Sequence, residues 1–393
     1  MSDLGDLLSL EYGEPLPSEI RTGHGYPVFG SNGEVGRHDS LLIEGPGIIV
    51  GRKGSAGKVC WTDESFWPID TTYWVKCESG DQRWLYWLLS HLPLSRLGSS
   101  TGVPGLNRDD AYTLQVFEPP GNERRKIAMV LDTLETSIRQ TEAIIEKLKL
   151  VKQGLLHDLL TRGIDANGEL RPSQTHAPHL YKDSPLGWIP VEWEVLPLCE
   201  LGDVLRGKFT HRPRNDPAFY GGAFPFIQTG DVAQAAGGYL TEFSQTLSER
   251  GAAVSQEFPA GTIAITIAAN IADTAILSIP MYFPDSVVGM IVSHAINVQF
   301  VELSIRRAKP KLDARAPQSA QKNINLQDLR PLLIAVPHKH EQDEIASRAE
   351  AIQLRIQAEE KFVDKLMREK TGLMDDLLTG RVCVTPLLET LGT

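Results

Sequence analysis

The chain has 393 residues, of which 41% are hydrophobic and 23% are charged. This balance excludes a wholly disordered or collagen-like chain and predicts two or three globular domains. The formal net charge of −11 argues against a protein that coats nucleic acid by bulk attraction. It leaves open a DNA reader with local basic regions, or a subunit whose partners carry the positive charge.

The cysteine pattern and the hydropathy favour a cytoplasmic protein. The four cysteines form no C-x-x-C pair, which is typical of a reducing compartment. No basic segment precedes an apolar run at the N-terminus, so we expect no signal peptide. The most apolar stretch, Gly261–Met281, contains Asn270, Asp273 and Pro280, and we interpret it as two buried strands rather than a membrane span.

The strongest signal is an internal repeat. Residues 126–161 match residues 344–379 at an offset of 218, with identities that include Gly154/Gly372 and Leu159/Leu377. The same offset extends upstream to Asn107/Asn325 and Pro119/Pro337. Leu4-Gly5-Asp6 matches Leu201-Gly202-Asp203 at an offset of 197, so the second copy carries about 21 extra residues before its helix.

Each copy ends in a long segment with apolar residues spaced four and three apart, which predicts two helices with an a/d seam. Polar residues interrupt both seams at equivalent places, Thr141/Glu359 and Lys152/Lys370. Because both helices belong to one chain, an antiparallel pair is the simplest geometry. The predicted pairing seam consists of Ile127, Leu131, Leu134, Ile138, Ile145, Leu148, Leu155, Ile345, Ile352, Ile356, Val363, Leu366 and Leu373.

The remaining segments resemble short strands with Gly/Pro turns, apart from a proline-rich stretch that predicts a linker. We therefore predict an α+β fold. Two mixed α/β domains are separated by two long helices that form an antiparallel coiled coil, in a pseudo-two-fold internal repeat. The predicted parts are a first domain (1–121), a first helix (122–162), a linker (163–190), a second domain (191–337), a second helix (338–380) and a C-terminal tail (381–393).

Catalytic and metal-binding motifs are not found in the sequence. The stretch Gly51–Val59 resembles a P-loop but has five residues between Gly51 and Gly57 where four are needed, and Val59 replaces the hydroxyl residue that would bind magnesium. No H-E-x-x-H, Cys/His zinc spacing or G-x-S-x-G occurs. We expect no catalytic residue, no metal site and no cofactor bound by this chain.

Local basic regions are the candidate DNA-binding residues. Residues 304–330 carry seven Lys/Arg against two Asp, together with Gln and Asn side chains suited to base edges. A second basic loop begins at Arg206, and a third lies among the glycines of 51–58, where backbone N–H groups can approach a phosphate. The candidates are Arg52, Lys53, Lys58, Arg206, Lys208, Arg212, Arg214, Arg306, Arg307, Lys309, Lys311, Arg315 and Lys322.

Taken in order along the chain, these motifs resemble the specificity (S) subunits of type I restriction–modification systems. The resemblance covers nearly the whole chain, and its motifs occur in the same order in both halves. They are the two Leu-Gly-Asp motifs, Gly51–Val59, 67–72, Thr101–Asp110 with Ser319–Asp328, Gly187–Pro190 with Trp193 and Leu196, and LLHDLLTRG with LMDDLLTGR.

The resemblance implies that this chain selects the DNA sequence and that partner subunits catalyse the reactions. Each mixed domain would be a target recognition domain that reads one half of a split double-stranded DNA sequence. The helices would set the gap and dock two methyltransferase subunits, which methylate adenine with S-adenosylmethionine. Motor and nuclease (restriction) subunits that use ATP and Mg would join them.

Two alternatives remain at this point. A coiled-coil assembly scaffold could keep the architecture without reading DNA, and an enzyme could carry an unrecognised site. The first half also has only Met1–Asp3 before its Leu-Gly-Asp, where the second half has a strand. Either the first domain lacks this strand, or the C-terminal tail replaces it, or the start is misplaced.

Overall fold

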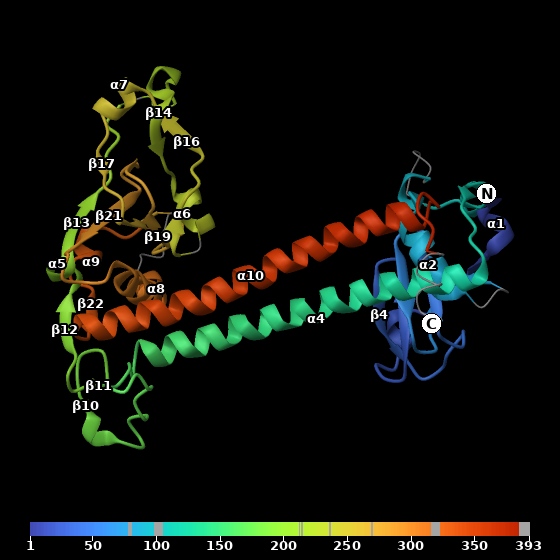
Figure 1. Cartoon of the computed structure of the whole chain (residues 1–393), viewed down its shortest axis with the longest axis horizontal. Coiled ribbons are helices and arrows are strands. Elements are labelled where there is room, and N and C mark those ends of the chain that lie inside the picture. The colour runs from blue at the N-terminus through green and yellow to red at the C-terminus, as the bar shows by residue number, and fades with distance from the viewer. Residues whose placement is uncertain are drawn as a thin grey trace. The chain divides into compact units, whose positions relative to one another are not determined.

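A computed structural model of the chain describes residues 1–77, 81–97, 105–211, 213, 215–235, 237–268, 270–315 and 323–384. The chain forms two compact units (Figure 1). Unit 1 comprises Met1–Ile145 and Ala358–Thr393, and unit 2 comprises Glu146–Gln357. Each of the two long helices, shown in green and red in Figure 1, therefore contributes residues to both units.

Unit 1 contains a four-stranded sheet of order β2-β8-β5-β6, a three-stranded sheet of order β4-β3-β7, and the pair β1-β9. Its strands are β1 (Ser2–Asp3), β2 (Ser9–Tyr12), β3 (Tyr26–Gly30), β4 (Gly33–His38), β5 (Gly47–Gly51), β6 (Val59–Thr62), β7 (Trp67–Pro68), β8 (Thr72–Lys76) and β9 (Gln115–Val116). Its helices are α1 (Leu4–Leu7), α2 (Gln82–His91), α3 (Arg108–Tyr112) and parts of the long helices α4 (Gly121–Leu159) and α10 (Lys339–Leu377).

The core of unit 1 joins the four-stranded sheet, α2 and both long helices. Trp84 and Trp87 of α2 are almost fully buried and share one apolar cluster with Leu10 of β2. The same cluster contains Leu131 of α4 and Leu377 of α10. Burial of these large apolar side chains favours packing of the helices on the domain.

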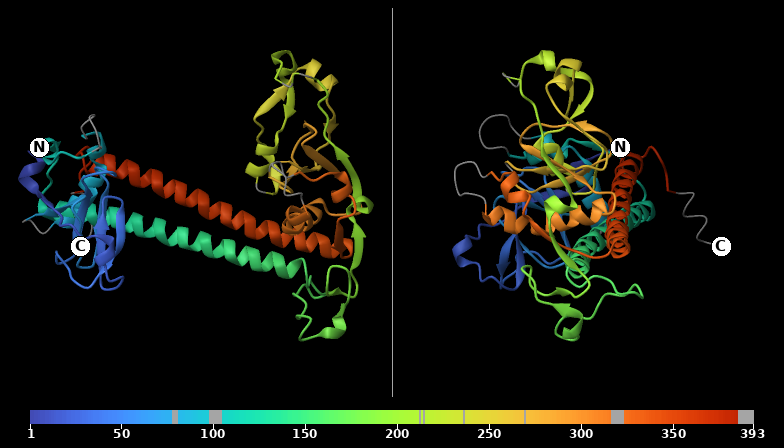
Figure 2. Two further views of the ribbon diagram at one scale, coloured as in Figure 1. Left: turned by 180° about the vertical axis from the view of Figure 1, so that it is seen from behind. Right: turned by 90° about the vertical axis from the view of Figure 1, so that its left-hand side faces the viewer.

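Unit 2, whose strands run from green to orange in Figure 2, contains two larger sheets and two strand pairs. The sheets are five-stranded, of order β13-β21-β18-β19-β15, and four-stranded, of order β16-β14-β20-β17, and the pairs are β10-β11 and β12-β22. Its helices are α5 (Leu198–Leu201), α6 (Thr229–Ala235), α7 (Glu249–Ala253), α8 (Val298–Arg315), α9 (Leu326–Leu329) and parts of α4 and α10. Its strands are β10 (Tyr181–Lys182), β11 (Ile189–Pro190), β12 (Glu194–Pro197), β13 (Gly202–Arg206), β14 (Tyr220–Phe226), β15 (Tyr239–Leu240), β16 (Gln245–Leu247), β17 (Glu257–Phe258), β18 (Ile263–Thr266), β19 (Thr274–Leu277), β20 (Met281–Tyr282), β21 (Val287–Val292) and β22 (Leu333–Val336).

The most apolar stretch of the sequence forms the centre of unit 2. Strands β18 and β19 are antiparallel neighbours, and every residue in both is buried. The prediction of two buried strands is confirmed. Within the described ranges, no helix combines the length and the apolar character needed to cross a membrane.

Equivalent backbone hydrogen bonds relate the two units, and they correct the sequence alignment at the start of the repeat. The N–H of Leu4 donates to the carbonyl of Leu114 (2.9 Å), and the N–H of Leu198 donates to that of Leu332 (2.8 Å). Leu4 therefore corresponds to Leu198, at an offset of 194, and not to Leu201 as the matching tripeptides predicted. Helix α1 is equivalent to α5, and the short strand β1 to β12. The alternative that the first domain lacks this strand is wrong.

Downstream, the structure confirms the offset of 218. The side chain of Asn107 caps α3 by accepting from the N–H of Asp109, and the side chain of Asn325 caps α9 by accepting from the N–H of Gln327. Both units thus repeat the same strand, short helix and capped helix.

The long helices run antiparallel within each unit. In unit 1, Lys370 Nζ contacts Glu135 Oε2 at 2.5 Å, and in unit 2, Lys152 Nζ contacts Gln353 Oε1. Lys370 corresponds to Lys152 and Gln353 corresponds to Glu135 at the offset of 218, so equivalent positions of the two copies make this contact. Residues of the predicted seam are all buried or half-buried, which is the arrangement expected of two paired helices.

Segment 163–190, for which the sequence predicts a linker, belongs to the folded part of unit 2. Its strands β10 and β11 form an antiparallel pair, and Ile164, Tyr181 and Ile189 are buried. Arg171 is 6% exposed and forms ion pairs with Glu192 and Glu341. The few apolar residues of this segment lack periodicity, so the sequence does not signal their burial.

Candidate nucleic-acid interface

The glycine-rich loop 51–58 closes on itself in unit 1. The N–H of Gly51 donates to the carbonyl of Lys58, and the N–H groups of Arg52 and Lys53 both donate to the carbonyl of Thr71. These amides are already hydrogen-bonded within the domain, so the expectation that they can approach a phosphate is wrong for them. The side chains of Lys53 and Lys58 are exposed, and Lys58 Nζ donates to the Asn32 carbonyl at 2.8 Å.

Arg52 belongs to a cluster that sequence reasoning missed. Its Nε and Nη2 donate to the carbonyl oxygen of Asp70, at 3.0 and 2.6 Å. Its guanidinium carbon lies 5.1 Å from the ring centroid of Tyr12, and that of Arg108 lies 4.9 Å from the same ring. Tyr12 is 50% exposed, so an aromatic face and two cations share one surface of the domain.

Tyr73 lies beside Tyr12 and is one of the buried residues that support this cluster. The two ring centroids are 5.2 Å apart, and the Tyr73 hydroxyl donates to the carbonyl of Leu106. Burial, with a smaller contribution from Tyr12, raises the pKa of Tyr73 to about 12. Tyr73 therefore stays neutral at physiological pH and adds no negative charge to the cationic surface.

In unit 2, Arg206 and Lys208 are exposed on the chain that leaves β13. Arg206 Nε donates to the carbonyl oxygen of Asp285 at 2.7 Å. Two further candidates of this loop, Arg212 and Arg214, lie outside the described residues.

The basic stretch predicted around α8 is largely occupied by contacts inside unit 2. Arg306 lies 3.5 Å from the carboxylate of Glu302, and Lys309 forms an ion pair with Asp273. Arg307 Nη1 donates to the carbonyl of Leu160 at 2.7 Å. Lys311 is exposed. The structure describes neither the side chain of Arg315 nor any part of Lys322.

A buried carboxyl explains part of this arrangement. Glu302 is 2% exposed and accepts a hydrogen bond from Thr274 Oγ1 at 2.6 Å. Burial raises its pKa, while Arg306 and the hydroxyl of Thr274 oppose that rise. Arg306 thus neutralises a buried acid, which a count of positive residues in the sequence cannot reveal.

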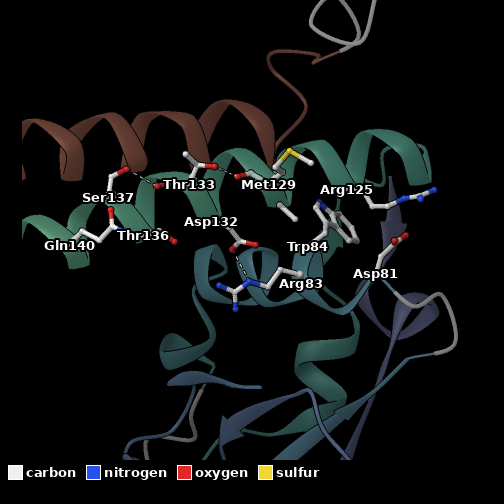
Figure 3. Close-up of a pocket in the computed structure, with 11 residues that line it drawn as sticks. Asp81, Arg83, Trp84, Arg125, Met129, Asp132, Thr133, Thr136, Ser137 and Gln140 are labelled. Atoms are coloured by element: carbon white, nitrogen blue, oxygen red, sulfur yellow. Dashed lines mark hydrogen bonds and ion pairs between the residues drawn. The ribbon is translucent and has the colours of Figure 1, made fainter. Parts of the chain in front are cut away.

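A hollow of about 680 Å³ lies between α2 and the first part of α4 in unit 1 (Figure 3). Trp84 and Arg83 line it from α2, and Met129 and Asp132 line it from α4. Arg83 Nε donates to Asp132 Oδ1 at 2.7 Å. Within the described chain, the buried Nε1 of Trp84 has no hydrogen-bond partner, and neither has Nη1 of Arg83. Among the described residues, no three His, Cys, Asp or Glu side chains gather as metal ligands would.

The repeated domains and the paired helices agree with the comparisons to known proteins. The family model described as "Type I restriction modification DNA specificity domain" matches residues 1–150 and 190–366. The chain belongs to this family, and its fold is that of a specificity subunit.

Curated relatives resemble the chain in sequence, and a solved structure resembles it in fold. The MjaVIII specificity subunit of Methanocaldococcus jannaschii is 26% identical over 73% of this chain, and the putative MjaX specificity subunit of the same organism is 26% identical over 71%. The matches span 66% and 62% of those proteins, slightly less than two thirds of their length. An S subunit structure from M. genitalium, 16% identical, aligns with a TM-score of 0.62 over 96% of this chain and 95% of its own.

Proposed function

We propose that this chain is the DNA-recognition subunit of a type I restriction–modification complex and that each mixed domain binds one half of a bipartite target. The observation that carries the proposal is the duplication of the domain around equivalent hydrogen bonds, Leu4 to Leu114 and Leu198 to Leu332. Two copies of one reading domain are suited to two half-sites, because rigid protein geometry sets half-site spacing.

The two long helices would set that spacing. Their polar contacts, Lys370 with Glu135 and Lys152 with Gln353, support one register of pairing. A polar residue in an apolar seam lowers stability but specifies register, which a spacer of defined length requires.

Partner subunits would supply the chemistry in the cytoplasm. Two methyltransferase subunits would methylate adenine with S-adenosylmethionine, and restriction subunits would use ATP and Mg. The hollow at Trp84 is a candidate docking surface for a methyltransferase subunit. Support comes from the 57% exposure of the apolar side chain of Met129, which lines this hollow.

A methylation map of the host genome, with this gene intact and deleted, tests the proposal. Loss of adenine methylation from one split motif on deletion is the expected result. If methylation is unchanged, the purified chain with its methyltransferase subunits should be titrated with DNA at several salt concentrations. A steep salt dependence would maintain the proposal, whereas a flat one would favour the scaffold without DNA readout.

A further inference from the structure

In each recognition domain an arginine side chain binds at an equivalent place in the fold. The two arginines, Arg52 and Arg206, do not occupy equivalent positions in the sequence repeat. Tyr12 of β2 pairs with Tyr73, and Arg206 of β13 pairs with Val288, at the same place in equivalent strands. The residue equivalent to Arg206 is therefore Tyr12. Arg52 comes from another strand end, next to β5.

The carbonyl groups that bind these arginines are equivalent. In unit 1, the N–H of Thr72 donates to the carbonyl of Ile69 (2.9 Å), and in unit 2 the N–H of Val287 donates to that of Pro284 (3.0 Å). The residue that follows the accepting residue is an aspartate in both units, namely Asp70 after Ile69 and Asp285 after Pro284. The main-chain oxygen of Asp70 accepts from Arg52, and that of Asp285 accepts from Arg206.

We propose that these two guanidinium groups are equivalent DNA phosphate contacts, one in each recognition domain. This inference rests on the proposed function. A guanidinium held through Nε loses less rotational freedom on binding, and its remaining N–H groups match the geometry of a phosphate. The hydrogen bonds described for Arg206 use Nε alone, and this side chain is exposed.

The surroundings of Arg52 support the assignment. Tyr12 is half-exposed, its ring contacts both Arg52 and Arg108, and Lys53, next to Arg52 in the chain, is exposed. A cluster of cations suits the DNA backbone, because Lys and Arg contacts to phosphates supply the sequence-independent part of the affinity. Arg306, by contrast, lies 3.5 Å from the buried carboxylate of Glu302, which makes it a poorer candidate.

The test uses the complex of the full chain with its methyltransferase subunits, titrated with target and unrelated duplexes at several salt concentrations. We expect R52A and R206A each to weaken binding to both duplexes by about tenfold. Each should also reduce the slope of log K against log salt by about 0.9, the contribution of one phosphate contact. R250A removes another exposed arginine of unit 2, in α7, and should change neither quantity. D70N keeps the carbonyl and removes an exposed carboxylate, so binding should be equal or tighter.

Three results would overturn the inference. They are binding by R52A and R206A equal to that of R250A, an unchanged salt slope, and a loss confined to the target duplex, which would indicate base readout. If the unmodified complex itself shows no salt-dependent binding, the proposed function fails rather than this assignment. Should R52A fail to fold, R206A decides, because its side chain is exposed and Arg206→Lys provides a variant that keeps the charge.

Discussion

Glu123 and Glu341, 218 residues apart, each bind the backbone that follows the other long helix. Glu341 Oε1 accepts from the N–H of Ile164 at 2.8 Å in unit 2. Glu123 Oε1 accepts from the N–H of Val384 at 2.9 Å in unit 1. Each carboxylate thus satisfies a main-chain donor beyond a helix end, where donors otherwise lack partners once buried.

The two glutamates should differ in their effect on stability. Glu341 also pairs with Arg171, which is nearly buried, so E341A leaves a buried charge and should cost about 3–5 kcal/mol. E123A removes an acceptor and leaves only neutral donors without it, the Cys383 thiol and the Val384 N–H, so it should cost about 1–3 kcal/mol. Urea unfolding measures both, with E192A as the control for an exposed partner of Arg171. Equal losses for E341A and E192A would contradict the assignment of Glu341 as the main partner.

Two glycines of the first repeat should respond oppositely to alanine. Gly154 lies within α4 and a Cβ there meets nothing within 4 Å, so G154A should stabilise the chain by about 1 kcal/mol. Gly163 has φ +64°, and a Cβ would stand 2.1 Å from Glu341 Oε1. G163A should therefore destabilise the chain, because both the backbone and the carboxylate must move. Thermal unfolding of the two variants decides, and stabilisation by G163A would show that the contact is dispensable.

The buried acid of unit 2 predicts a pH-dependent variant. Burial raises the pKa of Glu302, so the stability associated with its neutral form is present at low pH and lost as pH rises through the raised value. E302Q, which keeps an acceptor for Thr274, should raise the urea midpoint at pH 8 and change it little at pH 4. E249Q, at an exposed site, is the control. An equal effect of E302Q at both pH values would exclude the burial explanation.

Shortening the helices tests their role as a spacer. Deleting 141–147 together with 358–364 removes one heptad from each helix and keeps the pairing of Lys370 with Glu135 and of Lys152 with Gln353. Seven residues correspond to about 10 Å of helix, or about three base pairs. A methylation map of cells carrying this variant should show the same half-sites with a changed gap. Altered half-sites would refute the spacer role.

The hollow beside Trp84 predicts a variant defective in assembly alone. M129E places a charge on the exposed apolar side chain of this hollow and should reduce co-purification of the methyltransferase subunit at least tenfold, because the charge must be desolvated on docking. V35E alters a similarly exposed residue on β4 and should have no effect. Both variants should keep the unfolding temperature of the parent. Normal assembly by M129E would move the docking surface elsewhere.

The sequence by itself determined the repeat, the two long helices and the buried hairpin of unit 2, because each depends on periodicities that span many residues. Full or partial burial along the predicted seam, from Ile127 to Leu373, follows directly from the spacing of its apolar residues. Matches between short motifs aligned the two halves less reliably. The Leu-Gly-Asp match failed by three residues, because a tripeptide carries less information than the backbone bonds that align Leu4 with Leu198.

Only the tertiary structure decided which charged residues are available on the surface. Arg306 and Lys309 stand out in the sequence, yet each forms an ion pair with a carboxylate brought close by folding, that of Glu302 or of Asp273. Conversely, Tyr12, Arg52 and Arg108 are distant in sequence and meet only because β2, β5 and α3 converge. Charge in a sequence is a local property, whereas its exposure depends on contacts between residues far apart in the chain.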